Sequence, residues 1–348
     1  MQKKDIISYT VEELKDYLSF INEKPFRAMQ IYEWLHQKLA DNFDDMTNIS
    51  NKLKIKLKED FYIESLEIVK VLTSKLDGTQ KFLFRLKDGN VIESVLMKYK
   101  HGNSVCISTQ VGCRMGCRFC ASTLDGLVRN LTVSEMLKEI YTIQRYSNER
   151  VSNIVLMGSG EPMDNFDNVT AFVNAISDEN GLHISQRNIT ISTCGLIDNI
   201  KKLADMNFQV TLALSLHAAD DETRRELMPI ARRYTIREEL DACQYYFDKT
   251  KRRITFEYSL VSGINDNIKE AEKLVSLIKG MNCHVNLIPV NPIKERDYKK
   301  SSTGNIAGFK KYLEKNGINV TIRREMGSDI QGACGQLRKS FIETSKNQ

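Results

Sequence analysis

The stretch Cys113-Arg114-Met115-Gly116-Cys117-Arg118-Phe119-Cys120 places three cysteines close together in the chain, with three and then two residues between them. Three thiolates at this spacing can fold around one metal centre. On a cubane iron–sulfur cluster they leave the fourth iron without a protein ligand, so that iron can coordinate a substrate or cofactor. The alternative is a structural zinc site, which normally takes four ligands, and no fourth Cys or His stands at a finger-like spacing. We therefore predict an iron–sulfur cluster held by Cys113, Cys117 and Cys120.

The cysteine stretch follows the first strand of a regular pattern, in which strands and helices alternate from residue 104 to the end of the sequence. This alternation predicts parallel βαβ units. Roughly six such units suit a full or incomplete (βα) barrel, whose chemistry lies at the carboxyl ends of its strands. A doubly wound open sheet is the competing architecture. The expected strands are Val105–Gln110, Ile154–Met157, Asn188–Ser192, Val210–Leu216, Ile254–Leu260, His284–Val290 and Val320–Arg323. Helices are expected at Thr132–Gln144, Asn199–Met206, Ile268–Lys279 and Asn305–Asn316.

The first hundred residues differ from this pattern. Thr10-Val11-Glu12-Glu13 has the form of a capping box that begins a helix, and residues 1–64 are expected to form a helical accessory domain. Residues 65–100 alternate between apolar and polar side chains, with turns at Asp77-Gly78 and Asp88-Gly89-Asn90, so they predict a short antiparallel β extension. The expected fold class is therefore α/β, an incomplete (βα) barrel over residues 101–348 preceded by the helical domain and the β extension.

The composition is ordinary for a globular protein, with 41% hydrophobic and 27% charged residues among 348. No apolar run is long enough to span a bilayer, and no apolar signal core follows the basic start, so a cytoplasmic location is expected. Cysteines in that compartment indicate metal ligands, catalytic thiols or small core residues before structural disulfides. The net charge is +5, but residues 1–50 carry 6 basic and 9 acidic groups, whereas residues 251–348 carry 18 and 10. This basic C-terminal region is compatible with binding to nucleic-acid phosphates.

The cysteine spacing resembles the signature of the radical S-adenosylmethionine (SAM) superfamily. This resemblance implies a [4Fe–4S] cluster whose open iron binds the amino and carboxylate groups of SAM, which is then cleaved to a 5′-deoxyadenosyl radical. Polar residues at successive strand ends support the interpretation, because they converge on one site in a barrel. Glycines in Gly158-Ser159-Gly160-Glu161-Pro162 permit close approach of the backbone to a ligand, and Glu161 can accept from an ammonium group. The expected cofactor-binding residues are Gly160, Glu161, Ser192, Ser215, Leu216, His217 and Asn291.

A narrower resemblance covers nearly the whole chain, and by it the sequence is similar to the RlmN/Cfr family of radical SAM RNA methyltransferases. The stretches that carry it are Cys106–Cys113, Arg129–Thr132, Gly160–Pro162, Ser215–His217, Asn286–Pro292 and Gly332–Leu337. The chain departs from the family pattern at Ser159, where Met is usual, and at Cys194, where Ser is usual. Neither departure is at a position that has a catalytic role in the family.

The family resemblance implies a route that uses two SAM molecules per turnover. The first methylates Cys334, and the second supplies the radical that takes a hydrogen atom from the new S-methyl group. The carbon radical adds to an adenine ring, Glu93 accepts the proton that leaves the ring carbon, and Cys106 attacks the sulfur, releasing the methylated base as a disulfide forms. Without the family, Cys106 would be interpreted as a buried strand residue and Glu93 as belonging to a solvated strand face.

The implied substrates are C2 of an adenine in 23S rRNA at the peptidyl-transferase centre and C2 of the adenine 3′ of the anticodon in a subset of tRNAs. A flavodoxin- or ferredoxin-type electron donor is expected as a partner. A Cfr-like enzyme that methylates C8 of the rRNA adenine and confers antibiotic resistance is the closest alternative. Pro289-Val290 and the stretch Arg323–Gly327 favour the C2 branch of the family. An alternative of another class is a nonenzymatic RNA-binding protein stabilised by a metal, which would hold zinc in place of the cluster.

Overall fold

The computed structural model describes residues 3–100, 102–293, 295–333 and 335–337, so Cys334 lies outside the described residues. Within them the helices are α1 (Val11–Phe20), α2 (Arg27–His36), α3 (Asn51–Asp60), α4 (Val133–Ser147), α5 (Phe166–Ser177), α6 (Ile197–Asp205), α7 (Asp221–Leu227), α8 (Ile236–Thr250), α9 (Ile268–Ile278) and α10 (Thr303–Lys315). The strands are β1 (Lys4–Asp5), β2 (Phe61–Tyr62), β3 (Glu67–Thr73), β4 (Gln80–Arg85), β5 (Val91–Tyr99), β6 (Gly102–Ile107), β7 (Gln110–Gly112), β8 (Leu127–Asn130), β9 (Val151–Leu156), β10 (Ile189–Thr193), β11 (Thr211–Ser215), β12 (Ile254–Leu260), β13 (Cys283–Pro289) and β14 (Asn319–Ile322).

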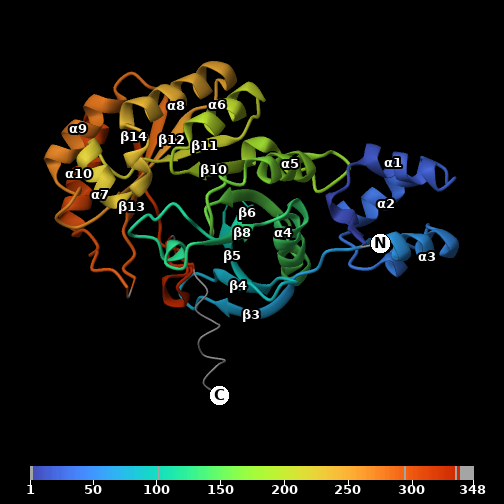
Figure 1. Ribbon diagram of the computed structural model, residues 1–348. Coiled ribbons are helices and arrows are strands. Elements are labelled where there is room, and N and C mark those ends of the chain that lie inside the picture. Colours follow the sequence, from blue (N-terminus) through green and yellow to red (C-terminus); the bar gives the residue numbers. More distant parts are fainter. Residues whose placement is uncertain (1–2, 101, 294, 334, 338–348) are drawn as a thin grey trace.

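One large sheet organises the molecule, in the order β14-β13-β12-β11-β10-β9-β6-β5-β4-β3. Neighbours from β6 to β14 are parallel, and the helices that connect them cover the outside of the curved sheet (Figure 1). A doubly wound sheet reverses its strand order at a switch point. Here the order follows the chain without reversal, and β14 and β3 do not pair, so the predicted incomplete (βα) barrel is confirmed.

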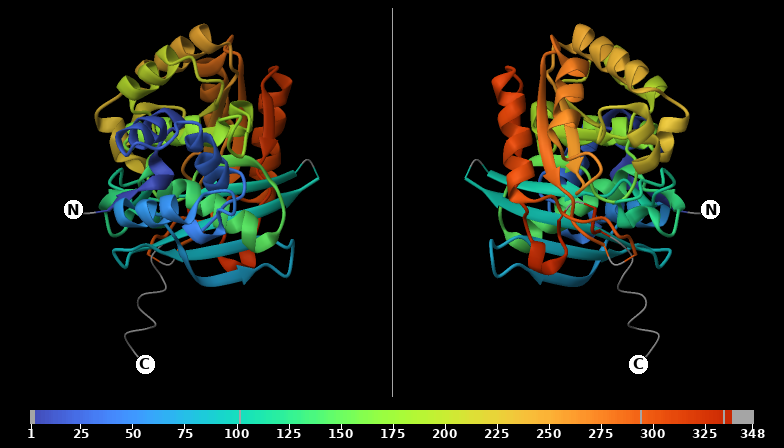
Figure 2. Two further views of the ribbon diagram at one scale, coloured as in Figure 1. Left: turned by 90° about the vertical axis from the view of Figure 1, so that its right-hand side faces the viewer. Right: turned by 90° about the vertical axis from the view of Figure 1, so that its left-hand side faces the viewer.

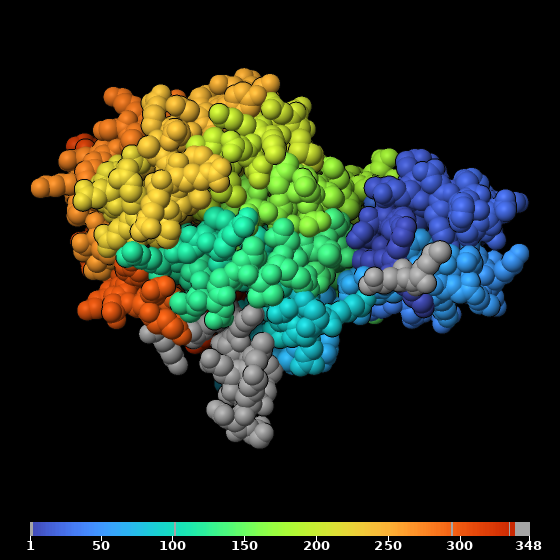
Figure 3. All heavy atoms as spheres, in the orientation of Figure 1, coloured from blue at the N-terminus to red at the C-terminus, as the bar shows by residue number. Residues whose placement is uncertain are grey.

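The N-terminal helices form a lobe at one end of the molecule, shown in blue in Figures 1 and 3. The capping box that begins α1 is confirmed, since Thr10 Oγ1 accepts from the Glu13 backbone N–H and Glu13 Oε2 accepts from that of Thr10. The lobe docks on α4 through polar contacts, one of them fully buried. His36 Nδ1 lies 2.8 Å from the Tyr141 hydroxyl, and the buried Lys138 ammonium lies 2.9 Å from Asp41.

The antiparallel strands β3, β4 and β5 prolong the parallel sheet, because β5 pairs with β6. Alternation of side chains along these strands gives the extension a different environment on each face. One face, which includes Phe82, Phe84 and Ile92, joins the main apolar core that also contains residues of α4. The other face packs against the described residues of the C-terminal segment, 326–333 and 335–337, since Met326 and Leu337 cluster with Val95, Met97 and Cys106. Asp77 accepts from Gly327 N–H at 3.0 Å, and Asp329 accepts from Lys75 N–H at 2.9 Å. Figure 2 shows the end of the described chain, in red, next to these antiparallel strands in both side views.

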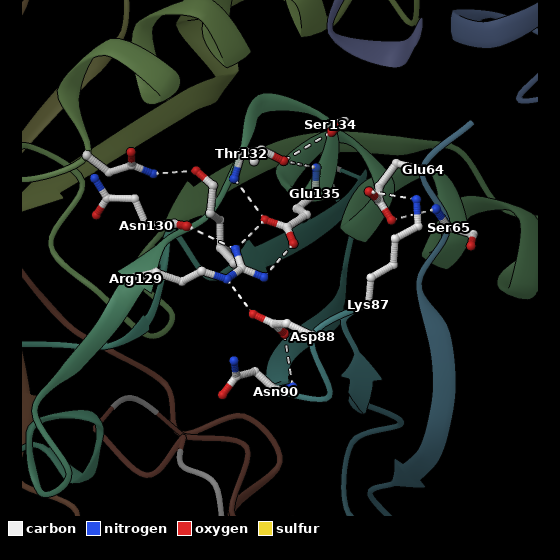
Figure 4. Close-up of polar contacts among 12 residues, drawn as sticks. Glu64, Ser65, Lys87, Asp88, Asn90, Arg129, Asn130, Thr132, Ser134 and Glu135 are labelled. Carbon is white, nitrogen blue, oxygen red and sulfur yellow. Dashed lines mark hydrogen bonds and ion pairs between the residues drawn. The ribbon is translucent and has the colours of Figure 1, made fainter. Parts of the chain in front are cut away.

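A small hairpin of β7 and β8 was not expected from the sequence. The predicted strand Val105–Gln110 ends at Ile107, because the N–H groups of Thr109 and Gln110 turn to the carbonyl of Ser159 instead of continuing the ladder. The hairpin is fixed by Arg129, whose guanidinium bridges Asp88 in the β4–β5 turn and Glu135 in the first turn of α4 (Figure 4). Within the described residues no helix combines the length and the apolarity that a membrane crossing needs.

Candidate active site

The carboxyl ends of the parallel strands line one cavity of about 130 Å³. This arrangement follows from topology, because parallel strands end at the same edge of the sheet. The cavity is lined by every residue that the sequence assigned to the cluster and cofactor except Leu216: Cys113, Cys117, Cys120, Gly160, Glu161, Ser192, Ser215, His217 and Asn291. The strand ends therefore bring together the cysteine loop and the polar groups as expected.

The cysteine loop lies between β7 and the short helix at Ala121–Thr123, and hydrogen bonds hold its backbone. The Thr123 hydroxyl donates to the carbonyls of Cys117 and Cys120, at 3.1 and 2.9 Å. Gly112 has φ +76°, and a Cβ there would lie 2.0 Å from the carbonyl oxygen of Gly126. Only glycine therefore lets the two ends of the cysteine loop, at Gly112 and Gly126, come so close together.

The chemistry of this donor set fits a cluster better than a single ion. Burial raises the pKa of Cys113 to about 12 and that of Cys117 well above its ordinary value, and nearby thiols and Glu161 act in the same direction. Ionising these thiols requires a bound cation to offset the cost. No three His, Cys, Asp or Glu side chains within the described residues are grouped closely enough to hold one metal ion. In a cluster each cysteine binds a different iron, so such close grouping is not needed.

Glu161 is a buried carboxylate at the edge of the cavity. Its two oxygens accept from the backbone N–H groups of Cys194, at 2.8 Å, and Met163, at 3.0 Å. Burial raises the pKa of Glu161, and these hydrogen bonds together with one from Thr193 oppose that effect. The preceding Gly160 packs on Gln110, where a Cβ would lie 2.7 Å from the backbone nitrogen. The loop thus fixes a carboxylate where it can accept from an ammonium group.

The other strand ends supply neutral polar groups. His217, at φ +56°, is buried, and burial with the nearby Arg224 lowers its pKa to about 3. Its Nδ1 accepts from the Ser259 N–H at 2.9 Å, so the ring proton is on Nε2. Leu216 does not line the cavity, because its side chain is in the main core and its N–H donates to the Glu257 carbonyl. Its role as a cofactor contact stays a prediction.

Sequence reasoning missed the buried ion pair that holds these strand ends together. Arg224 on α7 and Glu239 on α8 are fully buried, with Nη1 and Oε1 2.7 Å apart. Arg224 also donates to the carbonyls of Cys194 and Leu216, each at 3.0 Å, and to that of Ser215 at 3.2 Å. One guanidinium thus ties the loops after β10 and β11. No sequence signal separates Arg224 from its exposed neighbour Arg225.

We expect Arg224→Met to lower the free energy of unfolding by roughly 3–5 kcal/mol, because it leaves the Glu239 carboxylate buried without its partner. The matched control is Arg225→Met, an exposed change on the same helix that should stay within about 0.5 kcal/mol of the parent protein. Anaerobic urea unfolding of both variants, followed by far-ultraviolet circular dichroism, measures the difference. Equal midpoints for the two variants would show that the pair does not stabilise the strand ends.

Two of the three predicted catalytic residues, Cys106 and Glu93, lie on the sheet face that packs against the C-terminal segment. Cys106 is 7% exposed and lines a second cavity, of about 30 Å³, together with Met97 and Ala333. Glu93 is 3% exposed and lines a further small cavity, so the interpretation of a solvated strand face is wrong for this residue. Cys334 lies outside the described residues. The cavities of Cys106 and of the cluster cysteines share five lining residues: Met157, Ile288, Asn291, Arg323 and Leu337.

The fold and the cysteine-lined cavity at its strand ends define a radical SAM enzyme. Residues 107–277 match the radical SAM superfamily, and residues 4–63 match the ribosomal RNA large subunit methyltransferase N-terminal domain. A crystal structure of a radical SAM methyltransferase from Sphaerobacter thermophilus is similar over 97% of this chain and 99% of its own, with a TM-score of 0.93 and 40% identity.

Sequence similarity to curated proteins identifies the family to which the chain belongs. The probable dual-specificity RNA methyltransferase RlmN of Lachnospira eligens is 62% identical, with 97% of each chain covered, and that of Lachnoclostridium phytofermentans is 61% identical over 100% of this chain and 98% of its own. The chain belongs to the RlmN family of radical SAM methyltransferases. Membership implies a [4Fe–4S] cluster and SAM, and it makes the protein an enzyme, so the nonenzymatic alternative is wrong.

Proposed function

We propose that this enzyme methylates C2 of adenine in 23S rRNA and in tRNA through a methylated cysteine. The names of the relatives support RNA as the substrate, and the basic C-terminal region of the sequence supports contact with phosphates. We also propose a cytoplasmic location and a flavodoxin- or ferredoxin-type electron donor. The observation that carries the proposal is the sharing of lining residues between the cluster cavity and the Cys106 cavity.

When bound, the cluster and SAM supply the methyl group and the radical. The residues of the chain then have separate tasks. Glu161 and His217 orient the cofactor from the strand ends, and Cys334 carries the methyl group. The neighbours of Cys334 support this role, since Gly335 lines the cluster cavity and Ala333 lines that of Cys106. Glu93 takes the proton of the adenine carbon, and Cys106 then attacks the Cys334 sulfur.

The test of the proposal is mass spectrometry on both partners of the reaction. Protein made in cells should carry an added methyl or methylene group on Cys334. Ribosomal RNA and tRNA incubated with the holoenzyme, SAM and a reductant should contain 2-methyladenosine after nuclease digestion. Finding 8-methyladenosine instead would favour the Cfr-like alternative, and finding no methylated adenine would exclude both.

Cys334→Ala should keep the cluster and yet transfer no methyl group, because the carrier sulfur is gone while the three cluster cysteines remain. Iron and sulfide content, 5′-deoxyadenosine and methyladenosine are measured on one preparation. We expect full iron content, cofactor cleavage that no longer depends on RNA, and no methyladenosine. Normal RNA methylation by this variant would end the assignment of Cys334 as carrier.

A further inference from the structure

Lys81 is a buried lysine on the sheet face that carries Glu93 and Cys106. In the register of the sheet Lys81 lies opposite Val95, and Val95 lies opposite Cys106, so three adjacent strands place these side chains in one row. The Lys81 side chain is 4% exposed, and that of Glu93 is 3% exposed. Removing an ammonium group from water is costly unless an anion and hydrogen bonds compensate for it. The position therefore requires a partner for the lysine.

The Lys81 ammonium has two contacts of different kinds. Its Nζ lies 3.4 Å from Glu93 Oε1 and donates to the carbonyl oxygen of Gln331 at 3.3 Å. Gln331 stands three residues before Cys334 in the sequence and has φ +52°, an unusual conformation for a residue with a side chain. One cation thus touches both the carboxylate and the C-terminal segment.

Among the described residues, the other charged groups near this face contact different groups or are exposed. Asp77 and Asp329 accept from backbone N–H groups at the edge of the segment. Asp125 lines the cavity of Glu93 but is exposed, and Arg323 lies on the side of Cys106, where its Nη1 contacts the Met157 sulfur. A carboxylate buried without a nearby cation tends to take up a proton. A protonated Glu93 could not accept another.

We propose that Lys81 is a positioning residue for the proton transfer: it holds Glu93 as a carboxylate, aimed at the C-terminal segment. This inference rests on the proposed function, because it assigns Lys81 to the proton-transfer step of that reaction. It adds no covalent step. The adenine proton goes to the Glu93 carboxylate, and Lys81 keeps its own proton throughout.

A double-mutant cycle tests the proposal. Lys81→Met, Glu93→Gln and the double variant are compared as holoenzymes with the rRNA substrate, SAM and dithionite. The two products measured are 5′-deoxyadenosine and methyladenosine. We expect each single change to lower methyladenosine about 100-fold, the scale of a lost general base, while Cys334 is still methylated and 5′-deoxyadenosine still forms. The double variant should be no worse than Glu93→Gln, because Lys81 acts only through Glu93.

Two further variants separate this role from simple stabilisation of the sheet. Lys81→Arg keeps the positive charge and should restore methyladenosine formation. Arg85→Met is the matched control, since Arg85 is also on β4 but pairs with Glu67 at an exposed site, and it should behave like the parent enzyme. A parent-like product ratio in Lys81→Met, or a defect in the double variant equal to the product of the single defects, would overturn the proposal.

If Lys81→Met does not fold, the double variant and Lys81→Arg decide the question, because neither buries an unpaired charge. The proposal then requires that the double variant equal Glu93→Gln and that Lys81→Arg equal the parent, and failure of either overturns it. Failure of the proposed function has a different signature. In that case the parent enzyme itself makes 5′-deoxyadenosine without methyladenosine, or its Cys334 remains unmethylated.

Discussion

Replacement of Cys113, Cys117 or Cys120 by Ala should abolish the conversion of SAM to 5′-deoxyadenosine. In the predicted assignment each thiolate would hold one iron of the cluster, and the structure places all three cysteines around one cavity at the strand ends. Burial raises the pKa of Cys113 and of Cys117, and the positive charge of bound iron would offset the cost of ionising them. Losing one ligand would weaken the hold on the cluster, and without the cluster no iron charge would offset the ionisation of the remaining thiols.

The measurement is iron and sulfide content together with 5′-deoxyadenosine formation in anaerobic, reconstituted protein. Cys283→Ala is the matched control, because Cys283 begins β13 at the opposite end of that strand from the cavity. It should keep the full iron content and the cleavage activity. Full iron content and cleavage in any one of the three loop variants would contradict the assignment of that cysteine as a ligand.

The strand pattern could be predicted from the sequence because burial of parallel strands leaves a strong apolar signal. Ile254–Leu260 is found at the predicted bounds, and residues 1–64, which were expected to be helical, contain α1, α2 and α3. The hairpin of β7 and β8 could not be predicted in this way. The turn from β6 into β7 depends on hydrogen bonds from Thr109 and Gln110 to Ser159, about fifty residues later in the chain, and such bonds leave no local pattern in the sequence.

In the site too, residues marked by a local sequence pattern could be predicted, and residues that depend on contacts with distant elements could not. Cysteine spacing and strand-end polar residues predicted the cavity lining, since topology alone brings these positions together. Arg224 and Lys81 were not predicted. Whether a basic side chain is exposed or buried depends on partners from other elements, here Glu239 on α8 and Glu93 on β5. Leu216 has the predicted position at a strand end, but it faces the core.

Cys106→Ala should accumulate a covalent protein–RNA adduct through Cys334. In the proposed reaction Cys106 acts only after carbon has joined the adenine ring, so its removal leaves the earlier steps intact. Cys334 would still be methylated, and the methylene bridge to adenine would still form. Release would fail, because no thiolate remains to attack the Cys334 sulfur. The position supports this role, since Cys106 is buried opposite Val95 and shares its cavity with Ala333, the residue before Cys334.

The measurement is a denaturing gel of Cys106→Ala protein isolated from cells, with and without ribonuclease. A slower band that ribonuclease converts to one close to the free protein is expected. The control is the double variant Cys106→Ala/Cys334→Ala, which should give no adduct because the bridging sulfur is absent. A packing role for Cys106 makes a different prediction, namely lower stability without any adduct. A single band at the free-protein mass under both conditions, with the Cys334 thiol unmodified, would therefore contradict the assignment of Cys106 as the resolving thiol.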